Sequence, residues 1–511
     1  MIANHNHRRL WLWIAAALAG ALQGASSCAA EQREEVETMK RQIEALQKQM
    51  ADVIQVNQEK QKRIETLEQQ VKSLQEAPRA AKIESSLDKA LAKLDAASES
   101  KARAGSPLLS YSATAPRAST GAIRLADVSV DMLMAGGTST ANEDQLHPNL
   151  QGGCHDPKKR GFTIQQTELS FSGAVDPYFN FESHMVATHH PITGETGLEL
   201  EEAYATTTSM PFGLQMKAGH FLTEFGRMNP THPHTWTYLD QAIINSRLFG
   251  GDGLRNPGAR VSWLAPAPWF SLLYVGAQNA TGETAVSFIG NEAIGGRPVD
   301  ARRVHHGDDL LYTARWENSV NLSETLTTLF GVSGLHGPNN TGPSGETWIG
   351  GLDFMFKWRP PDTTSTGHFV TWRTELMGRN YIADRFENEA GVVPSGTVRD
   401  WGFYSQVEAG ISRSWSAALR FDYATGTGPD YSVGEDDVAR VSRQLDPLRD
   451  TRWRLSPLLN WRLSEFSRVR FQYNLDRADH LRNVSGHDDP YAHSLWMGLE
   501  VMIGAHPAHN Y

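Results

Sequence analysis

Two different spacings of hydrophobic residues divide the chain, and the change falls near residue 121. From Val36 to Leu74 the hydrophobic positions lie alternately three and four residues apart among Glu, Gln, Lys and Arg, which is the heptad repeat of a coiled coil. From residue 121 onward, hydrophobic residues recur at every second position, which is the period of a β-strand. The pattern therefore predicts an α-helical coiled coil followed by an all-β domain.

The heptad repeat is interrupted by polar residues at two seam positions. Asn57 and Lys60 stand there, as expected of residues that fix the register at some cost in stability. β-Branched residues at one seam position and Leu at the other favour two strands. A short helix is predicted at 82–97, so the coiled coil and this helix together occupy residues 31–97. Residues 98–120 are rich in Ser, Ala, Gly and Pro and are predicted to be a linker.

Sixteen segments of the β domain, which we place at 121–511, have the character of strands. In WIGGLDFMFKW (348–358), for example, Trp348 and Leu352 share one apolar face, and Asp353 and Lys357 lie on the other. The predicted strands are 122–134, 162–175, 178–187, 198–208, 213–221, 258–265, 269–279, 309–317, 324–335, 348–358, 368–379, 400–411, 415–424, 451–463, 467–476 and 492–504.

The connections between these segments alternate between short and long. Tight turns at one end and long loops at the other, joining an even number of antiparallel strands, are typical of an outer-membrane barrel. A strand such as 348–358 would extend roughly 33 Å and, when tilted, would cover about 25 Å of membrane. We therefore predict a 16-stranded antiparallel transmembrane β-barrel. Secreted tandem β-sandwiches are the alternative, but their strands are mostly shorter.

The N-terminus has the features of a secretory signal peptide, predicted over residues 1–30. A basic segment at 7–9 precedes the apolar stretch 10–22, and small residues follow. Cleavage before Glu31 is expected, and lipidation of Cys28 is the alternative. With only two cysteines there is no disulfide framework, and Cys154 would remain a free thiol. The body contains no apolar run long enough for a transmembrane helix. The net charge of −10 gives no support for nucleic-acid binding.

Charged residues occupy the face of the strands that would point into the lumen. A lumen with charges of both signs must contain water, because an unpaired buried charge costs several kcal/mol. The alternative is that Arg–carboxylate pairs brace the barrel wall. The predicted pore-lining residues are Arg373, Glu375, Arg420, Asp422, Arg452, Arg454, Arg468 and Arg470.

Nineteen histidines raise the possibility of a metal site, because imidazole is a good ligand for zinc or copper. Their spacing matches no defined site, so scattered surface histidines are the alternative. The candidate metal ligands lie in predicted loops and are His189, His190, His232 and His234. There is no Gly-rich phosphate loop, HExxH motif or nucleophile elbow, so we expect neither an enzyme nor a cofactor.

The signal peptide, coiled coil and sixteen-stranded barrel together resemble the phosphate-selective porin superfamily, the O and P type porins. The best local matches are FTIQQTELSFSGAVDPYFNFE (162–182) and the segment 221–263, which are similar to a subgroup of putative porins or zinc-regulated outer-membrane receptors. The resemblance implies a homotrimer with one channel per subunit. Phosphate selectivity in the family depends on Lys- and Arg-rich channel surfaces, whereas Lys217 and Lys357 are the only lysines on the predicted strands.

The longest loop, 222–257, follows the fifth predicted strand. In sixteen-stranded porins the loop at this position usually folds inward and narrows the channel, and 237–249 could form a short helix in it. Ion pairs that merely hold the loop together are the alternative role for its charges. The predicted constriction residues are Glu224, Arg227, Asp240, Arg247, Asp252 and Arg255.

These observations predict an outer-membrane porin that forms a water-filled channel for passive diffusion of small solutes or ions. Its partners would be outer-membrane lipid, two further copies of the chain and, through the coiled coil in the periplasm, the cell wall. One alternative is a receptor or channel for a metal ion or metal chelate, such as zinc, that uses the loop histidines. Another is a structural tether in which the barrel is only an anchor.

Overall fold

The computed structural model describes residues 126–504, apart from 144–145, 191–192, 292–293, 301–305, 362–365, 389–390, 434–438, 442–447 and 484–488. The predicted signal peptide (1–30), the coiled coil and short helix (31–97) and the linker (98–120) lie outside the described residues.

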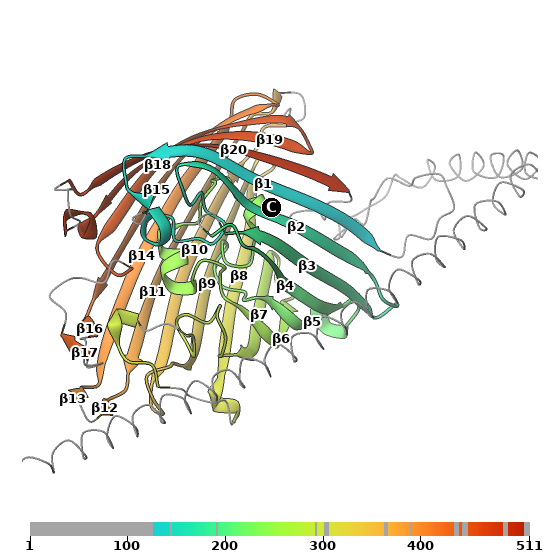
Figure 1. Cartoon of the computed structure of the whole chain (residues 1–511). Helices are drawn as coiled ribbons and strands as arrows, with labels where there is room; N and C mark the ends of the chain where they lie inside the picture. The colour runs from blue at the N-terminus through green and yellow to red at the C-terminus, as the bar shows by residue number, and fades with distance from the viewer. Residues whose placement is uncertain are drawn as a thin grey trace, which may run out of the picture. The chain divides into compact units, whose positions relative to one another are not determined.

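Sixteen strands of the described chain form a closed antiparallel barrel (Figure 1). Each strand pairs with the next one along the chain, and β1 pairs with β20 to close the sheet. This confirms the predicted barrel. The strands are β1 (Asp127–Ser139), β2 (Gly161–Ala174), β3 (Phe179–His189), β4 (Thr196–Thr207), β5 (Leu214–Leu222), β6 (Arg255–Leu264), β7 (Phe270–Asn279), β8 (Leu310–Ser323), β9 (Leu326–Pro338), β10 (Glu346–Trp358), β11 (Phe369–Ala383), β14 (Gly396–Gly410), β15 (Trp415–Thr427), β18 (Arg452–Ser464), β19 (Ser467–Ala478) and β20 (Tyr491–Gly504).

The two faces of the strands differ as the period of two requires. On β10, Trp348 and Leu352 are exposed on the outside of the barrel, while Ile349 and Asp353 are buried inside. On β15, Leu419 is 51% exposed, whereas its neighbour Arg420 is completely buried. An outer surface that exposes this many large apolar side chains around a closed sheet is suited to lipid, because no free strand edge remains.

The connections at one end of the barrel are mostly short, and those at the other end are mostly longer. The turns are 175–178, 208–213, 265–269, 324–325, 359–368, 411–414 and 465–466. The loops at the other end are 140–160, 190–195, 223–254, 280–309, 339–345, 384–395, 428–451 and 479–490. Two of these loops contain hairpins that the sequence did not predict, β12 (Phe386–Asn388) with β13 (Gly391–Val393) and β16 (Tyr431–Val433) with β17 (Ala439–Val441).

Helical structure in the described residues is confined to short pieces. No helix among them is long and apolar enough to cross a membrane. The helical pieces are the π-helix η1 (Leu146–Leu150), the α-helix α4 (Ile243–Phe249) and the 3₁₀ turns η2 (Pro211–Gly213), η3 (Pro233–Thr235), η4 (Ile294–Gly296), η5 (Gly307–Asp309) and η6 (Asp479–Asn483).

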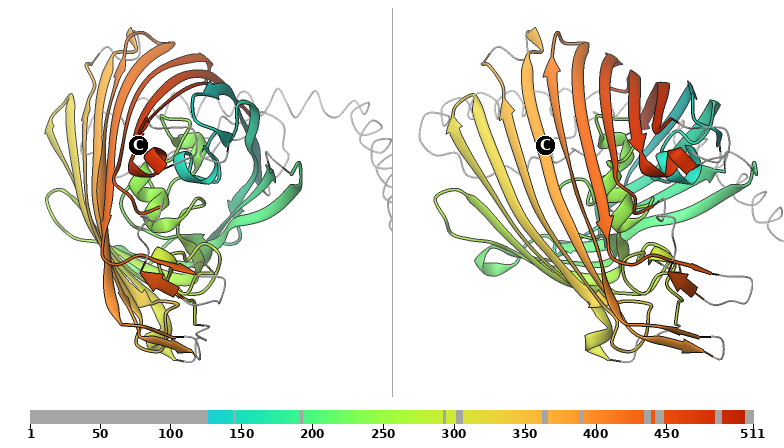
Figure 2. Two further views of the ribbon diagram at one scale, coloured as in Figure 1. Left: turned by 60° about the vertical axis from the view of Figure 1, so that its left-hand side comes forward. Right: turned by 90° about the vertical axis from the view of Figure 1, so that its left-hand side faces the viewer.

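Loop 3, residues 223–254, folds into the barrel, and its helix α4 lies inside the curved wall (Figure 2). The helix predicted at 237–249 is therefore present but shorter. Residues 237–242 are not helical, and side chains outside the loop accept backbone N–H groups there: Leu239 N donates to Gln472 Oε1 at 2.8 Å, and Gln241 N donates to Asp156 Oδ1 at 2.8 Å.

A glycine permits the close approach of loop 3 to the wall. Gly226 has φ +58°, and a Cβ at this position would lie 2.0 Å from Glu375 Oε2. Beyond it, Phe225, Ile244 and Phe249 form an apolar core with wall residues such as Met377. Part of the barrel interior is thus packed with protein, unlike the open water-filled lumen that the strand pattern alone suggested.

A positive charge at the middle of the outer face tests whether this surface meets lipid. Leu352→Arg, on the 54% exposed Leu352 of β10, is expected to lower the free energy of unfolding by about 2–4 kcal/mol. Glu324→Arg, in the turn between β8 and β9, is the control and should change it by less than about 0.5 kcal/mol. Urea titrations of both variants in phospholipid vesicles measure the difference, and equal effects would contradict the assignment.

Candidate functional site

Loop 3 is fixed to the wall by the carboxylate of Asp240, which is completely buried. Arg420 of β15 and Arg454 of β18 both donate to it, the latter at 2.8 Å, and Asn474 Nδ2 donates at 2.7 Å. Burial alone raises the pKa of Asp240, but the two guanidinium groups outweigh burial and lower this pKa to about 2. Asp240 is therefore ionised at every physiological pH and holds the loop to two strands at once.

The other predicted pore-lining arginines of β18 and β19 also bind loop backbone. Arg470 Nη1 donates to the carbonyl oxygens of Trp236 and Tyr238 at 3.2 and 3.1 Å. Arg452 and Arg454 donate to carbonyl oxygens of the first long loop, and Arg468 donates to the carbonyl oxygen of His234. Asp422 accepts from Arg420 Nε at 2.8 Å as well as from Ile243 N. These six residues, Arg420, Asp422, Arg452, Arg454, Arg468 and Arg470, point inward, where they hold loops.

Most of the predicted constriction residues form ion pairs with other parts of the barrel. Arg247 of α4 donates to the Asp450 carbonyl oxygen at 2.8 Å, and burial lowers its pKa to about 10 although Asp400 and Asp450 favour its charged form. Glu224 lies 3.0 Å from Arg260 Nε of β6 and 3.6 Å from Lys217 Nζ of β5. Arg255 pairs with Glu199 of β4, and Asp252 lies 3.6 Å from His155. Most of the charged side chains of loop 3 are therefore paired, and only part of its charge faces the open space inside the barrel.

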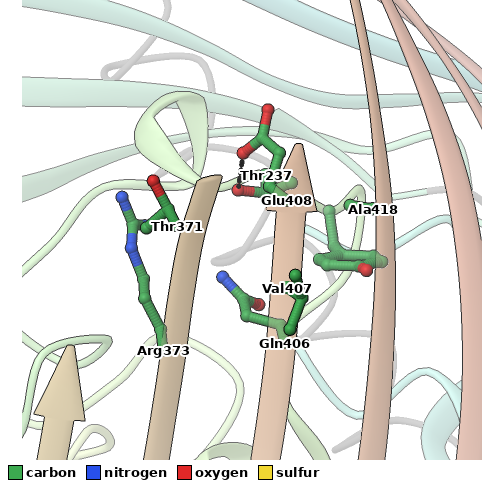
Figure 3. A pocket seen from close by; sticks show the side chains of 8 residues that line it. Thr237, Thr371, Arg373, Gln406, Val407, Glu408 and Ala418 are labelled. Atoms are coloured by element: carbon green, nitrogen blue, oxygen red, sulfur yellow. Dashed lines mark hydrogen bonds between the residues drawn. The ribbon is translucent and has the colours of Figure 1, made fainter. Parts of the chain in front are cut away.

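Arg227 of loop 3 lies near β11, the strand that carries Arg373 and Glu375. Glu375 of β11 is buried and accepts from Met228 N at 2.9 Å. Arg227 and Arg373 are half-buried and lie within electrostatic range of each other. Arg373 also lines a small crevice between the loop and the wall, where Thr237 Oγ1 donates to Glu408 Oε2 at 3.0 Å (Figure 3).

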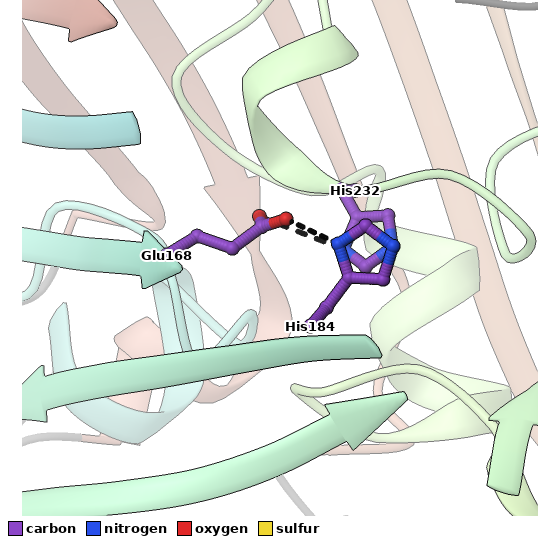
Figure 4. Close-up of side chains that lie close together, drawn as sticks. All are labelled: Glu168, His184 and His232. Atoms are coloured by element: carbon purple, nitrogen blue, oxygen red, sulfur yellow. Dashed lines mark hydrogen bonds and ion pairs between the residues drawn. The ribbon is translucent and has the colours of Figure 1, made fainter. Parts of the chain in front are cut away.

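A cluster of imidazoles and carboxylates joins loop 3 to β2, β3 and β4. Nδ1 of His184 lies 2.8 Å from Glu168 Oε1, and Nδ1 of His232 lies 3.6 Å from Glu168 Oε2 (Figure 4). One possible ligand atom from each of Glu168, His184 and His232 lies within 4.8 Å of the other two. All three residues are buried or nearly so: their side chains are 0%, 5% and 11% exposed.

Further polar groups surround this cluster. His232 Nδ1 lies 3.0 Å from Glu201 Oε2, and its Nε2 lies 2.8 Å from Glu202 Oε2. Nδ1 of His234 lies 3.0 Å from Glu168 Oε2. Burial alone lowers the pKa of His232, but the carboxylates of Glu168 and Glu201 outweigh it and hold the pKa well above the usual value.

Local backbone features bring these side chains together. His232 is extended, as expected before a proline, and the 3₁₀ turn η3 then carries His234 so that the two rings stack 5.6 Å apart. On β4 the register shifts between Glu202, which is opposite His184, and Leu200, which is opposite Met185. Glu201 is the extra residue of this β-bulge, so two consecutive glutamates both face inward.

The structure brings only half of the predicted metal ligands to this cluster. His232 and His234 belong to it, whereas His189 and His190 lie at the exposed end of β3, where His189 Nδ1 is 3.3 Å from Thr196 Oγ1. Sequence reasoning missed Glu168, His184, Glu201 and Glu202. The adjacent glutamates 201 and 202 break the alternation of a strand, and this was the available signal.

No protein-family model matches the chain. The chain is 28% identical over 365 residues to an uncharacterised protein of Aquifex aeolicus (strain VF5), which covers 69% of this chain and 71% of that one. Among solved structures it is similar to the outer membrane channel DcaP of Acinetobacter baumannii (TM-score 0.45, 10% identity, 74% and 96% of the two chains). Two further similar structures are the anion-selective porin from Comamonas acidovorans (TM-score 0.43, 8%, 74% and 98%) and the trimer form of OmpT, an outer membrane protein of Vibrio cholerae (TM-score 0.43, 6%, 74% and 99%).

The contribution of Asp240 to the stability of the protein can be tested by removing the charge of its side chain without changing the shape. Asp240→Asn leaves Arg420 and Arg454 buried without their shared carboxylate, and should lower the free energy of unfolding by about 3–5 kcal/mol. Asp479→Asn is the matched control: its pair with Arg477 is partly exposed and should contribute less than about 1 kcal/mol. Urea titration in detergent measures both, and similar losses would show that the buried anchor has no special role.

Proposed function

We propose that the protein is an outer-membrane porin that forms a water-filled channel for passive diffusion of small solutes or ions. The observation that carries the proposal is the closed sixteen-stranded barrel with apolar side chains outside and charged side chains inside. A barrel of this strand number is wide enough to leave an aqueous path beside an inserted loop. Lipid around the barrel and small solutes inside it would then be the partners.

Loop 3 supports the idea of a narrowed channel. Its buried ion pairs hold it against β15 and β18, and hydrogen bonds from Arg470 to its backbone hold it against β19. The charged side chains that keep partial exposure in the interior carry both signs and come from the loop and from the strands facing it. They include Lys217, Glu224, Arg227, Glu317, Lys357 and Arg373. Because positive and negative groups are mixed along this path, we expect weak ion selectivity.

Arg227→Glu tests whether this loop lines the conducting path. One charge at about 8 Å in water contributes on the order of 0.5 kcal/mol, and screening at an ionic strength near 0.15 M leaves about a third of that. Reversing the charge acts in opposite directions on cations and anions, so the cation-to-anion permeability ratio should change about two- to fivefold toward cations. Reversal potentials across planar bilayers in unequal salt measure the ratio. Arg385→Glu, on the exposed loop hairpin β12–β13, is the control and should leave it unchanged.

The wild-type protein in the same bilayers tests the proposed function itself. Discrete steps of conductance are expected. A barrel that inserts into the bilayer without conducting would favour the alternative in which it is a tether.

The proposal includes a homotrimer held by a coiled coil in the periplasm. The heptads of 36–74 support an oligomer, and an even strand number puts both ends of the barrel on the side of the short turns, which is periplasmic in such barrels. From there the coiled coil would also reach toward the cell wall.

Chemical cross-linking of residues 31–76 as a peptide tests the number of subunits. Three-chain products are expected. A predominantly two-chain product, which the β-branched residues of the seam favour, would contradict the trimer.

A further inference from the structure

The cluster around Glu168 contains more buried carboxylate groups than its hydrogen bonds stabilise. Asp131 of β1 lies directly opposite Glu168 in the antiparallel register, and the two side chains are 4% and 0% exposed. Like charges opposite each other on neighbouring strands are destabilising. In the described part of the chain, neither carboxylate oxygen of Asp131 has a hydrogen-bond partner. Glu201 and Glu202 add two further buried carboxylates beside His232.

The donor set suits a transition-metal ion. His184 and His232 offer imidazole nitrogens and Glu168 offers a carboxylate oxygen, all within 4.8 Å of one another. Neighbouring ligand atoms on a zinc ion lie about 3.3 Å apart, so small side-chain rotations would close the set around one ion. Nδ1 of His232 faces Glu168, so its Nε2 would donate to Glu202, 2.8 Å away, as an outer-shell partner usually accepts. Ser170 Oγ likewise donates to Glu168 Oε1 at 2.8 Å, and Glu201 lies 3.0 Å from Nδ1 of His232 as a further carboxylate beside the ion.

We propose that Glu168, His184 and His232 form a binding site for one divalent transition-metal ion of the zinc type. Such an ion adds positive charge among four buried carboxylates and connects loop 3 directly to β2 and β3. This inference does not depend on the channel function, because it concerns binding alone.

A narrow crevice lies next to the proposed site. His232 is the most exposed of the three proposed ligands, at 11%. The crevice is lined by Glu201, by His155 and by loop 3 residues, among them Asp252 and the two chain neighbours of His232, Thr231 and Pro233. The carboxylates that line this crevice would attract a cation toward the proposed ligands.

Zinc titration of the purified full-length protein tests the site. After removal of metals with a chelator, isothermal titration calorimetry in detergent should show one saturable Zn²⁺ site per chain. The double variant His184→Gln, His232→Ala should weaken binding at least tenfold, since loss of even an outer-shell partner costs that much. The matched control His189→Ala, His190→Ala removes two exposed histidines from the end of the same strand and should bind as wild type does.

Glu168→Gln keeps the size of the side chain and provides a variant that should fold even if the double histidine variant does not. It should also weaken zinc binding at least tenfold. With Co²⁺ as a second probe, the visible absorption bands of the ion bound to wild-type protein should be lost in Glu168→Gln. Unchanged zinc affinity in Glu168→Gln, or the absence of saturable binding to the wild-type protein, would overturn the proposal and leave the cluster as a hydrogen-bonded brace.

Discussion

The shared burial of opposite charges between loop 3 and the barrel wall is the interaction on which the interior depends. Arg420 and Arg454 lie on the inner face of β15 and β18 with almost no exposure, and such groups are tolerated in a protein interior only when paired. Asp240 supplies a charge to both of them from the loop. Asp422 and Asp476 of the wall also pair with these arginines, so the loop supplies one of the carboxylates that accompany each buried guanidinium group. The wall and loop 3 therefore each bury charges that are paired with charges of the other.

The sequence was sufficient to predict the wall. Long segments with a period of two, joined by alternating turns and loops, specify antiparallel neighbours without knowledge of any distant contact. All sixteen predicted strands are present, and most ends differ by only a few residues. The hairpins β12–β13 and β16–β17 were missed because strands of three residues are too short to show a period. The helix in loop 3 begins later than predicted, and side chains outside the loop bind the backbone before it.

The interior was predictable only in part. Alternation correctly placed Arg454 and Arg470 on the inner face, but it could not say that loop backbone would cover them. Such contacts depend on the position that a long loop takes in the folded barrel, and no local sequence pattern specifies this position. The histidine cluster shows the same limit. His232 and His234 were identified from composition, while His184 and Glu168 come from two strands whose register brings them to the loop.

The distance along the chain between Asp240 and its partner Arg454 has a consequence for how the protein forms. The two residues are separated by 214 positions, so the loop is synthesised long before the strand that receives it. Until β15 and β18 assemble, Asp240 lacks the two guanidinium groups with which it pairs. Closing so large a segment of chain is slow. Docking of the insert must therefore be among the last events of assembly, and a chain truncated before β18 would form neither the sealed cylinder nor its packed interior.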